Sequence, residues 1–148
     1  MGTHHKGTNK EITALNTYIK LVRAVESLNQ RLYPFLLKYN LSESQFAVLE
    51  AIYHIGPMNQ RELSSKLLKS PGNITMVIDN LEKRNYVKRE RGELDRRHYI
   101  IHLTSEGKEF IKRIFPEQVK SIVEELDVLT ETDQCQLQKM CKEIGIKE

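Results

Sequence analysis

The first long segment of the chain carries apolar residues at every third or fourth position. Between Thr8 and Tyr39 they stand at positions 12, 15, 19, 22, 25, 28, 32 and 36. This period places them on one face of an amphipathic helix. We expect Pro34 to kink this helix or to end its regular part, because proline lacks a backbone donor. Such a helix is longer than the core of a small domain needs, and packing against a second chain would use the excess.

Two shorter helices follow, and each begins at a recognisable cap. Ser42-Glu-Ser-Gln45 and Asn59-Gln-Arg-Glu62 both have the spacing of a capping box, in which the first and fourth residues satisfy each other's backbone amides. The first helix is expected to stop at Gly56-Pro57, and the second to run through Leu67.

The next helix is predicted over Ser70–Arg84. Ser70 is its N-cap and Pro71 its first residue, the position at which proline is favoured. Asn85 follows and can adopt the left-handed conformation that closes a helix. The inward positions are Ile74, Val77, Ile78 and Leu81, and the outward ones are Gly72, Asn73, Thr75, Met76, Asp79, Asn80 and Lys83.

After this helix the pattern changes from a period of 3.6 to a period of two. Tyr86–Arg91 and His98–Leu103 are predicted strands, joined by the loop Gly92–Arg97. Three helices followed by a hairpin with a basic tip are the order of a winged helix-turn-helix. Two more helices are expected, one beginning at Thr104 and bending at Pro116, and a last one opened by Thr130. The predicted fold class is therefore mainly α with a small β-hairpin.

Composition and charge support one domain with an anionic partner. The chain has 148 residues, 39% of them apolar, and a net charge of +3. Residues 61–97 carry a net charge of +4, while residues 117–148 carry −4. A basic middle beside an acidic tail suggests a middle built for an anionic partner. No apolar run approaches the ~18 residues of a membrane helix, so we expect no membrane partner and a cytoplasmic location.

The middle of the chain offers the chemistry of duplex DNA recognition. A helix fits the major groove and reads base edges with side chains near its N-terminus. Asparagine can pair bidentately with adenine, threonine or methionine can contact a thymine methyl group, and the helix start can hold a phosphate. A solvated helix face is the alternative explanation. The candidate contacts are Ser70, Gly72, Asn73, Thr75, Met76, Asn80 and Lys83.

The predicted hairpin strengthens this interpretation. Between Lys83 and Arg97 there are seven Lys or Arg residues and three acids. Arginine is favoured in a narrow minor groove because of the negative potential there. We therefore take Arg91, Arg96 and Arg97 as candidate DNA contacts of the hairpin. We expect Asp95 to pair with an arginine, such as Arg89, and to support the loop.

The predicted loop contains Asp95-x-Arg97, and Leu103-Thr-x-x-Gly107 follows it. With this motif as the most specific match, residues 41–107 resemble the MarR family of winged-helix transcriptional regulators. Asn85-Tyr86 departs from the Gly-Leu common in the family. The other matching stretches are Leu41–Leu49, Gly56-Pro57, Gln60–Leu63, Gly72–Thr75, Val77–Glu82 and Val87–Arg89.

The resemblance implies an organisation and a mode of action. Residues 1–40 would form an N-terminal dimerisation helix, 41–104 the DNA-binding module and 105–148 C-terminal dimerisation helices of one intertwined homodimer. Asp95 and Arg97 would be the wing pair, with Arg89 supporting them. A repressor released by a small anionic aromatic effector is typical of such proteins. The candidate residues for an effector cleft are Tyr18, Phe35, Tyr39, Tyr53 and His54, although an ordinary place in the core or interface is the favoured explanation for each.

Other classes of function find little support in the sequence. The phosphate-binding, serine-hydrolase and zinc-protease motifs are absent, so we expect no enzyme activity, no cofactor and no metal. A winged helix that contacts protein or RNA instead of an operator remains the alternative. Cys135 and Cys141 are too far apart on a helix for an internal disulfide. We expect them to be buried and inert, with an intersubunit redox pair as the other possibility.

Overall fold

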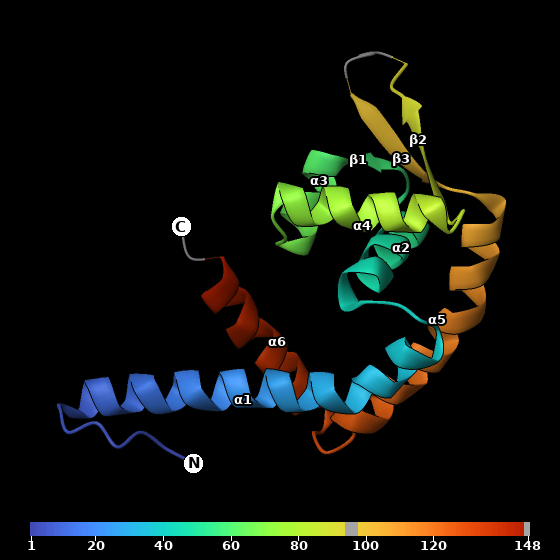
Figure 1. Cartoon of the computed structure of the whole chain (residues 1–148). Coiled ribbons are helices and arrows are strands. Elements are labelled where there is room, and N and C mark those ends of the chain that lie inside the picture. Colours follow the sequence, from blue (N-terminus) through green and yellow to red (C-terminus); the bar gives the residue numbers. More distant parts are fainter. Residues whose placement is uncertain (94–97, 147–148) are drawn as a thin grey trace. The chain divides into compact units, whose positions relative to one another are not determined.

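The computed structural model describes residues 1–93 and 98–146, and their arrangement is mainly helical (Figure 1). Contacts divide the chain into two compact units, Met1–Pro34 with Val119–Glu148 and Phe35–Gln118. In chain order the elements are α1 (Asn9–Lys38), α2 (Glu43–Ile55), β1 (Met58–Asn59), α3 (Gln60–Leu67), α4 (Pro71–Lys83), β2 (Val87–Arg91), β3 (Tyr99–Leu103), α5 (Ser105–Leu126) and α6 (Glu131–Gly145).

The first unit consists of helical segments from both ends of the chain. Its long helix begins where the sequence predicts, because Thr8 and Glu11 satisfy each other's backbone amides. The helix does not end at Pro34, because α1 continues past it to Lys38, and the alternative that Pro34 kinks the helix stays a prediction. The boundary between the two compact units falls directly after Pro34. Within the unit, Arg31 pairs with Glu125.

The last helix corrects the expectation for the cysteines. No residue of α6 is buried, and Cys135 and Cys141 are both exposed in the single chain. The expectation of buried thiols is therefore wrong for the isolated chain, because the apolar stripe of α6 has no partner that covers it there. Its predicted start is confirmed, since the Thr130 hydroxyl accepts a hydrogen bond from the Asp133 amide at 3.2 Å.

The second unit contains the predicted helix-turn-helix and its caps. Ser42 with Gln45 and Asn59 with Glu62 form complete capping boxes. Ser70 caps α4 by accepting a hydrogen bond from the Asn73 amide at 3.2 Å. These local contacts confirm the predicted starts of α2, α3 and α4.

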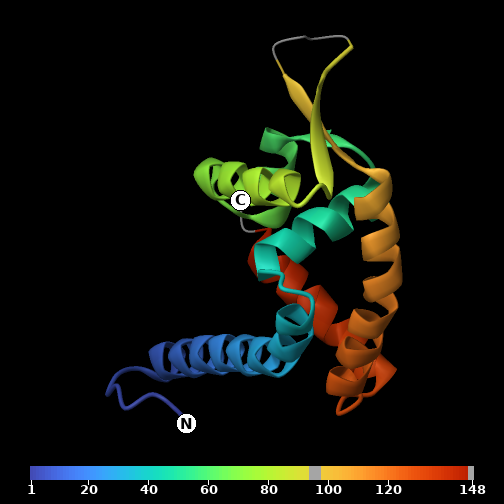
Figure 2. The ribbon, with the colours of Figure 1, turned by 45° about the vertical axis from the view of Figure 1, so that its right-hand side comes forward.

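The hairpin β2–β3 joins a third strand into an antiparallel sheet of order β1-β3-β2. Val87 pairs with Leu103 and Arg91 with Tyr99. The short edge strand β1 pairs through Met58 and Ile101, a contact that the sequence analysis did not predict. Figures 1 and 2 both show the hairpin extending beyond α3 and α4.

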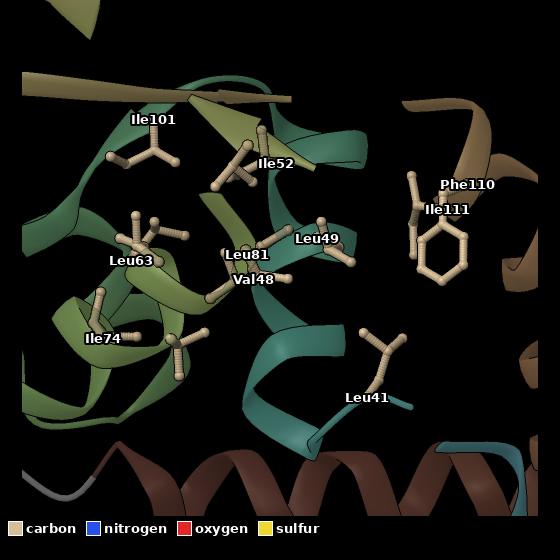
Figure 3. Close-up of a cluster of buried hydrophobic side chains, with 14 of the residues drawn as sticks. Leu41, Val48, Leu49, Ile52, Leu63, Ile74, Leu81, Ile101, Phe110 and Ile111 are labelled. Carbon is tan, nitrogen blue, oxygen red and sulfur yellow. The ribbon is translucent and has the colours of Figure 1, made fainter. Parts of the chain in front are cut away.

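One hydrophobic core holds the second unit together (Figure 3). The predicted inward face of α4 is confirmed, since Ile74, Val77, Ile78 and Leu81 are all buried. Phe35 and Leu36 at the end of α1 also belong to this core. So do Phe110, Ile111 and Ile114 from the first half of α5, and this is why the compact unit extends beyond residues 41–104 on both sides.

The start of α5 is hydrogen-bonded to the turn between α4 and β2. Asn85 has φ 59°, so it adopts the predicted left-handed conformation. The Thr104 hydroxyl donates to the Asn85 carbonyl at 2.6 Å, and the Thr104 amide donates to the Tyr86 carbonyl at 3.1 Å. A Cβ atom on Gly107 would lie only 1.9 Å from that Tyr86 oxygen, so the close approach requires glycine.

Candidate nucleic-acid interface

The N-terminus of α4 has a local charge that favours an anion. Its first turn contains no acidic residue, so nothing within it offsets the partial positive charge of the helix end. Gly72 is exposed, and no atom lies within 4 Å of the place where a Cβ would stand. A phosphate group can therefore approach the backbone amides of this turn closely.

Beyond this turn, α4 presents an exposed face with mixed chemistry. Met76, Asn80 and Lys83 follow one another at helical spacing and are all exposed. The Met76 side chain is 57% exposed although it is apolar. This face combines an apolar contact, an amide and a cation, which suits base edges and a phosphate.

Two of the predicted contact residues have less freedom than the sequence suggests. The Oδ1 atom of Asn73 is buried and has no hydrogen-bond partner among the described residues. Bidentate pairing with adenine, which needs both amide atoms in the groove, therefore requires a different rotamer. The Thr75 hydroxyl donates to the Pro71 carbonyl and accepts from Gln60 Nε2, both at 3.0 Å.

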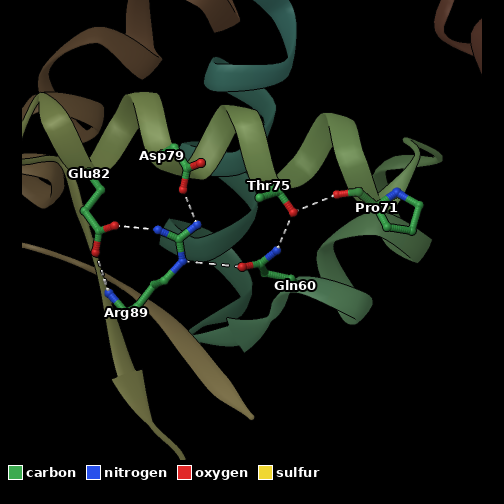
Figure 4. A network of polar contacts seen from close by, with 6 residues as sticks. All are labelled: Gln60, Pro71, Thr75, Asp79, Glu82 and Arg89. Carbon is green, nitrogen blue, oxygen red and sulfur yellow. Dashed lines mark hydrogen bonds and ion pairs between the residues drawn. The ribbon is translucent and has the colours of Figure 1, made fainter.

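Arg89 on β2 is the centre of a polar network against α4 (Figure 4). Its Nη1 atom lies 2.5 Å from Glu82 Oε2, and its Nη2 atom lies 2.5 Å from Asp79 Oδ1. Its Nε atom donates to Gln60 Oε1 at 3.4 Å, and Gln60 in turn reaches Thr75. Five side chains from three elements thus hold the hairpin strand to the predicted recognition helix.

The charge of Arg89 is secured by these contacts. Partial burial acts to lower the pKa of its guanidinium group, but the hydrogen bonds that Arg89 donates to Asp79 and Glu82 outweigh this and raise the pKa above its ordinary value. Arg89 is therefore a permanent cation whose donors already face carboxylates and an amide oxygen.

Of the three predicted DNA contacts of the hairpin, the structure describes Arg91, which is exposed at the end of β2. Asp95, Arg96 and Arg97 lie outside the described residues, so the predicted pairing of Asp95 with Arg89 remains a prediction. The sequence analysis missed Asp79, Glu82 and Gln60 as partners of Arg89. A helical signal existed, because Thr75, Asp79 and Glu82 stand at i, i+4 and i+7.

A groove lies beside the start of α4 and was not predicted. Its volume is about 340 Å³, and α3, α4 and β3 all contribute to it. Arg61 supplies a cation there, and the sequence analysis did not name it as a candidate contact. The lining residues are Asn59, Gln60, Arg61, Ser64, Pro71, His98 and Tyr99.

The predicted effector residues occupy different environments. Phe35 is buried and makes edge-to-face contacts with the rings of Tyr39 and Phe46, at centroid distances of 5.2 and 5.3 Å. The Tyr39 hydroxyl donates to Glu117 at 2.6 Å. Phe35 and Tyr39 are thus parts of the packed unit.

The remaining effector candidates are more accessible. The ring centroid of His54 lies 4.5 Å from that of Phe115 and 4.9 Å from that of Tyr53. Tyr18 belongs to the other unit and is exposed. These residues stay candidates for an effector site.

Neither a cluster of metal ligands nor a membrane-spanning helix is found in the part of the chain that the structure describes. Among residues 1–93 and 98–146, no three His, Cys, Asp or Glu side chains cluster closely enough to hold a metal ion. No helix of these same residues is long and apolar enough to cross a bilayer.

The helix-turn-helix, the exposed face of α4 and the adjoining hairpin define a winged-helix protein of the DNA-binding class. The model of the MarR family matches residues 41–99. The chain is 33% identical over 133 residues to YkoM, an uncharacterized HTH-type transcriptional regulator of Bacillus subtilis, with 90% of this chain and 86% of YkoM covered. The chain belongs to the MarR family, whose members are DNA-binding transcriptional regulators.

Solved structures support the same fold. AbsC, a MarR family transcriptional regulator from Streptomyces coelicolor, matches with a TM-score of 0.83 at 24% identity over 95% of both chains. NadR in complex with 4-hydroxyphenylacetate matches with a TM-score of 0.76 at 22% identity, over 100% of this chain and 99% of NadR. At these identities the likeness extends to the fold alone.

Proposed function

We propose that the protein binds a pseudo-palindromic operator as a homodimer and represses transcription from it. The carrying observation is the exposed face of α4, where Met76, Asn80 and Lys83 stand beyond a helix start free of acidic side chains. This face would enter the major groove, and the hairpin would reach the adjacent minor groove. Sequence would be read by Asn80 and Met76, while phosphate contacts would set the register.

Dimerisation rests on the apolar surface of the first unit. Tyr18, Val25, Val123 and Met140 are all exposed in the single chain. Exposed apolar side chains on three helices, α1, α5 and α6, favour an interface rather than a free surface. A two-fold dimer would place its two copies of α4 about one helical turn of DNA apart, ~10 base pairs between half-sites.

Release by an effector rests on a structural neighbour and on exposed aromatic side chains of this chain. NadR, of the same fold, is described in complex with 4-hydroxyphenylacetate. We propose a small aromatic anion as the ligand class, with Tyr53 and His54 of the second unit as its candidate contacts. Its binding would hold the two recognition helices at a separation that does not match the operator. A rise in Tm with 4-hydroxyphenylacetate or a related phenolic acid is expected, and no rise across a broad panel would refute the effector.

The test of DNA binding is a fluorescence-anisotropy titration with duplex DNA from upstream of the protein's own gene. Affinity should fall steeply as salt rises, because each phosphate contact releases counterions. Asn80→Ala should weaken binding to this duplex by about tenfold and should leave a scrambled duplex unaffected. Lys83→Ala should weaken both duplexes, whereas the matched Lys108→Ala on α5 should weaken neither.

The same titration distinguishes operator binding from the alternative function. A winged helix that serves protein or RNA contacts would not discriminate between the two duplexes at any salt concentration. A protein that sediments as a single subunit would refute the homodimer.

A further inference from the structure

Two carboxylates stand on the helix that we propose to enter the DNA groove. The side chains of Asp79 and Glu82 are 49% and 40% exposed, and both lie on the side of α4 that faces the hairpin. Unpaired carboxylates at this place would repel the phosphates of both strands. Something must offset them if α4 is to approach a polyanion.

Arg89 is positioned to do this. Its side chain is only 19% exposed, and its three kinds of nitrogen face Gln60, Glu82 and Asp79. Its backbone amide also donates to Glu82 Oε1 at 3.2 Å. Each of the three guanidinium nitrogens therefore donates to a partner inside the protein, and the low exposure of the side chain leaves little of it for a phosphate.

We infer that Arg89 is a positioning residue that shields Asp79 and Glu82 from DNA, rather than a DNA contact. The inference rests on the proposed DNA binding of α4. With Arg89 present the three side chains carry a net charge of −1, and without it the two carboxylates carry −2 beside the groove. The same contacts hold β2 against α4, which keeps the hairpin at the distance needed to meet the neighbouring minor groove.

The test is a double-mutant cycle read by anisotropy on duplex DNA. Arg89→Met keeps the apolar stem and should weaken binding roughly 30-fold in the wild-type background, since it exposes two like charges to the phosphates. In an Asp79→Asn, Glu82→Gln background the same change should cost less than about threefold, because nothing remains to be shielded.

Arg91 is the matched control, because it is the next residue on the same face of β2. We predict Arg91 to be a direct contact, so Arg91→Met should weaken binding by the same factor in both backgrounds. If Arg91→Met is rescued like Arg89→Met, the rescue reflects total charge only, and the inference is wrong. If Arg89→Met costs equally in both backgrounds, Arg89 contacts DNA itself and the inference is also wrong.

Salt dependence gives a second readout. A residue that neutralises a phosphate contributes about 0.9 to the slope of log affinity against log salt. In the Asp79→Asn, Glu82→Gln background, Arg89→Met should leave this slope unchanged, and a fall of about 0.9 would refute shielding.

Two other outcomes can be distinguished from a failure of the shielding: unfolding of the Arg89→Met variant and failure of the proposed DNA binding. If Arg89→Met unfolds, Asp79→Asn with Glu82→Gln alone decides the matter: shielding predicts binding at least threefold tighter than wild type, and weaker binding would overturn it. If the wild-type protein does not bind duplex DNA at all, the proposed function fails before the cycle is measured.

Discussion

Gly107 allows the sharpest prediction about stability, because two physical effects predict opposite signs for Gly107→Ala. The added Cβ would lie 1.9 Å from the carbonyl oxygen of Tyr86 and 2.8 Å from its carbonyl carbon. Both are backbone atoms, and the oxygen already accepts a hydrogen bond from the Thr104 amide at 3.1 Å. No side-chain rotation can relieve the contact, so the start of α5 must move away from the turn between α4 and β2.

The magnitude follows from three contributions. Helix propensity alone favours alanine over glycine by about 1 kcal/mol. Overpacking costs about 1–3 kcal/mol, and a contact as short as 1.9 Å belongs at the upper end. Loss of the hydrogen bond between Thr104 and Tyr86 adds about 1 kcal/mol. The net expectation is a destabilisation of about 3 kcal/mol, which corresponds to a fall in Tm of about 10 °C.

The assay is denaturant unfolding followed by circular dichroism, at equal protomer concentration for every variant, because association makes stability depend on concentration. Gly72→Ala is the matched control. Gly72 also lies in the first turn of a helix, but its Cβ would meet no atom within 4 Å. The variant Gly72→Ala should therefore stabilise the protein by up to about 1 kcal/mol. If Gly107→Ala is as stable as the wild type, the close approach of α5 to Tyr86 is refuted.

Three other changes test local features of the structure. Hydrogen bonds from Lys38 and Tyr39 hold the pKa of Glu117 below its ordinary value, so this stabilisation is present above the unfolded-state pKa and is lost as pH falls through the folded-state pKa. The unfolding midpoint of the wild type should therefore fall more steeply between about pH 5 and pH 3 than that of Glu117→Gln, and parallel curves would contradict this. Leu68 is 91% exposed at φ 51°, so Leu68→Gly should raise the free energy of unfolding by up to about 1 kcal/mol, and a loss would show that this conformation is not strained. Asn85 has φ 59°, and its side-chain amide donates to Glu106, so Asn85→Ala should lower the free energy of unfolding by about 1–2 kcal/mol. A thermal unfolding curve at matched concentration that equals the wild-type curve would contradict this.

The helix starts of the second unit were predictable because each cap is a local interaction. The hydrogen bonds of Ser42, Asn59 and Ser70 reach only three residues along the chain. The strand β1 was not predictable in this way. It has two residues, and it exists because Met58 and Asn59 pair with Ile101 and Ile100 far along the chain.

The candidate site was predictable in its outline and not in its detail. Helical period alone identifies which positions of α4 face outward, and the burial of the inward set confirms it. The state of each outward side chain depends on distant partners. Thr75 is engaged by a residue 15 positions earlier, and Arg89 by one 29 positions earlier. Such pairs depend on how α3 and the hairpin pack against α4, which no local pattern contains.

Net charge illustrates the same point for the electrostatic argument. Residues 61–97 carry +4, and this excess is a sound reason to expect an anionic partner. However, a charge count does not separate free cations from paired ones. Arg84 donates to the carbonyl groups of Tyr39 and Asn40, and Lys88 pairs with Glu90.

Arg89 is likewise committed to Asp79 and Glu82, so much of the positive charge at the centre of this segment serves the fold. Among the described residues of this segment, four cations take part in neither an ion pair nor a side-chain hydrogen bond; they are Arg61, Lys66, Lys83 and Arg91. They stand around this centre, on α3, at the end of α4 and at the end of β2. Only such residues can exchange counterions for phosphates without first breaking an internal contact. The affinity for DNA should therefore follow the placement of these side chains at the margins of α4 and the hairpin rather than the total charge of the segment.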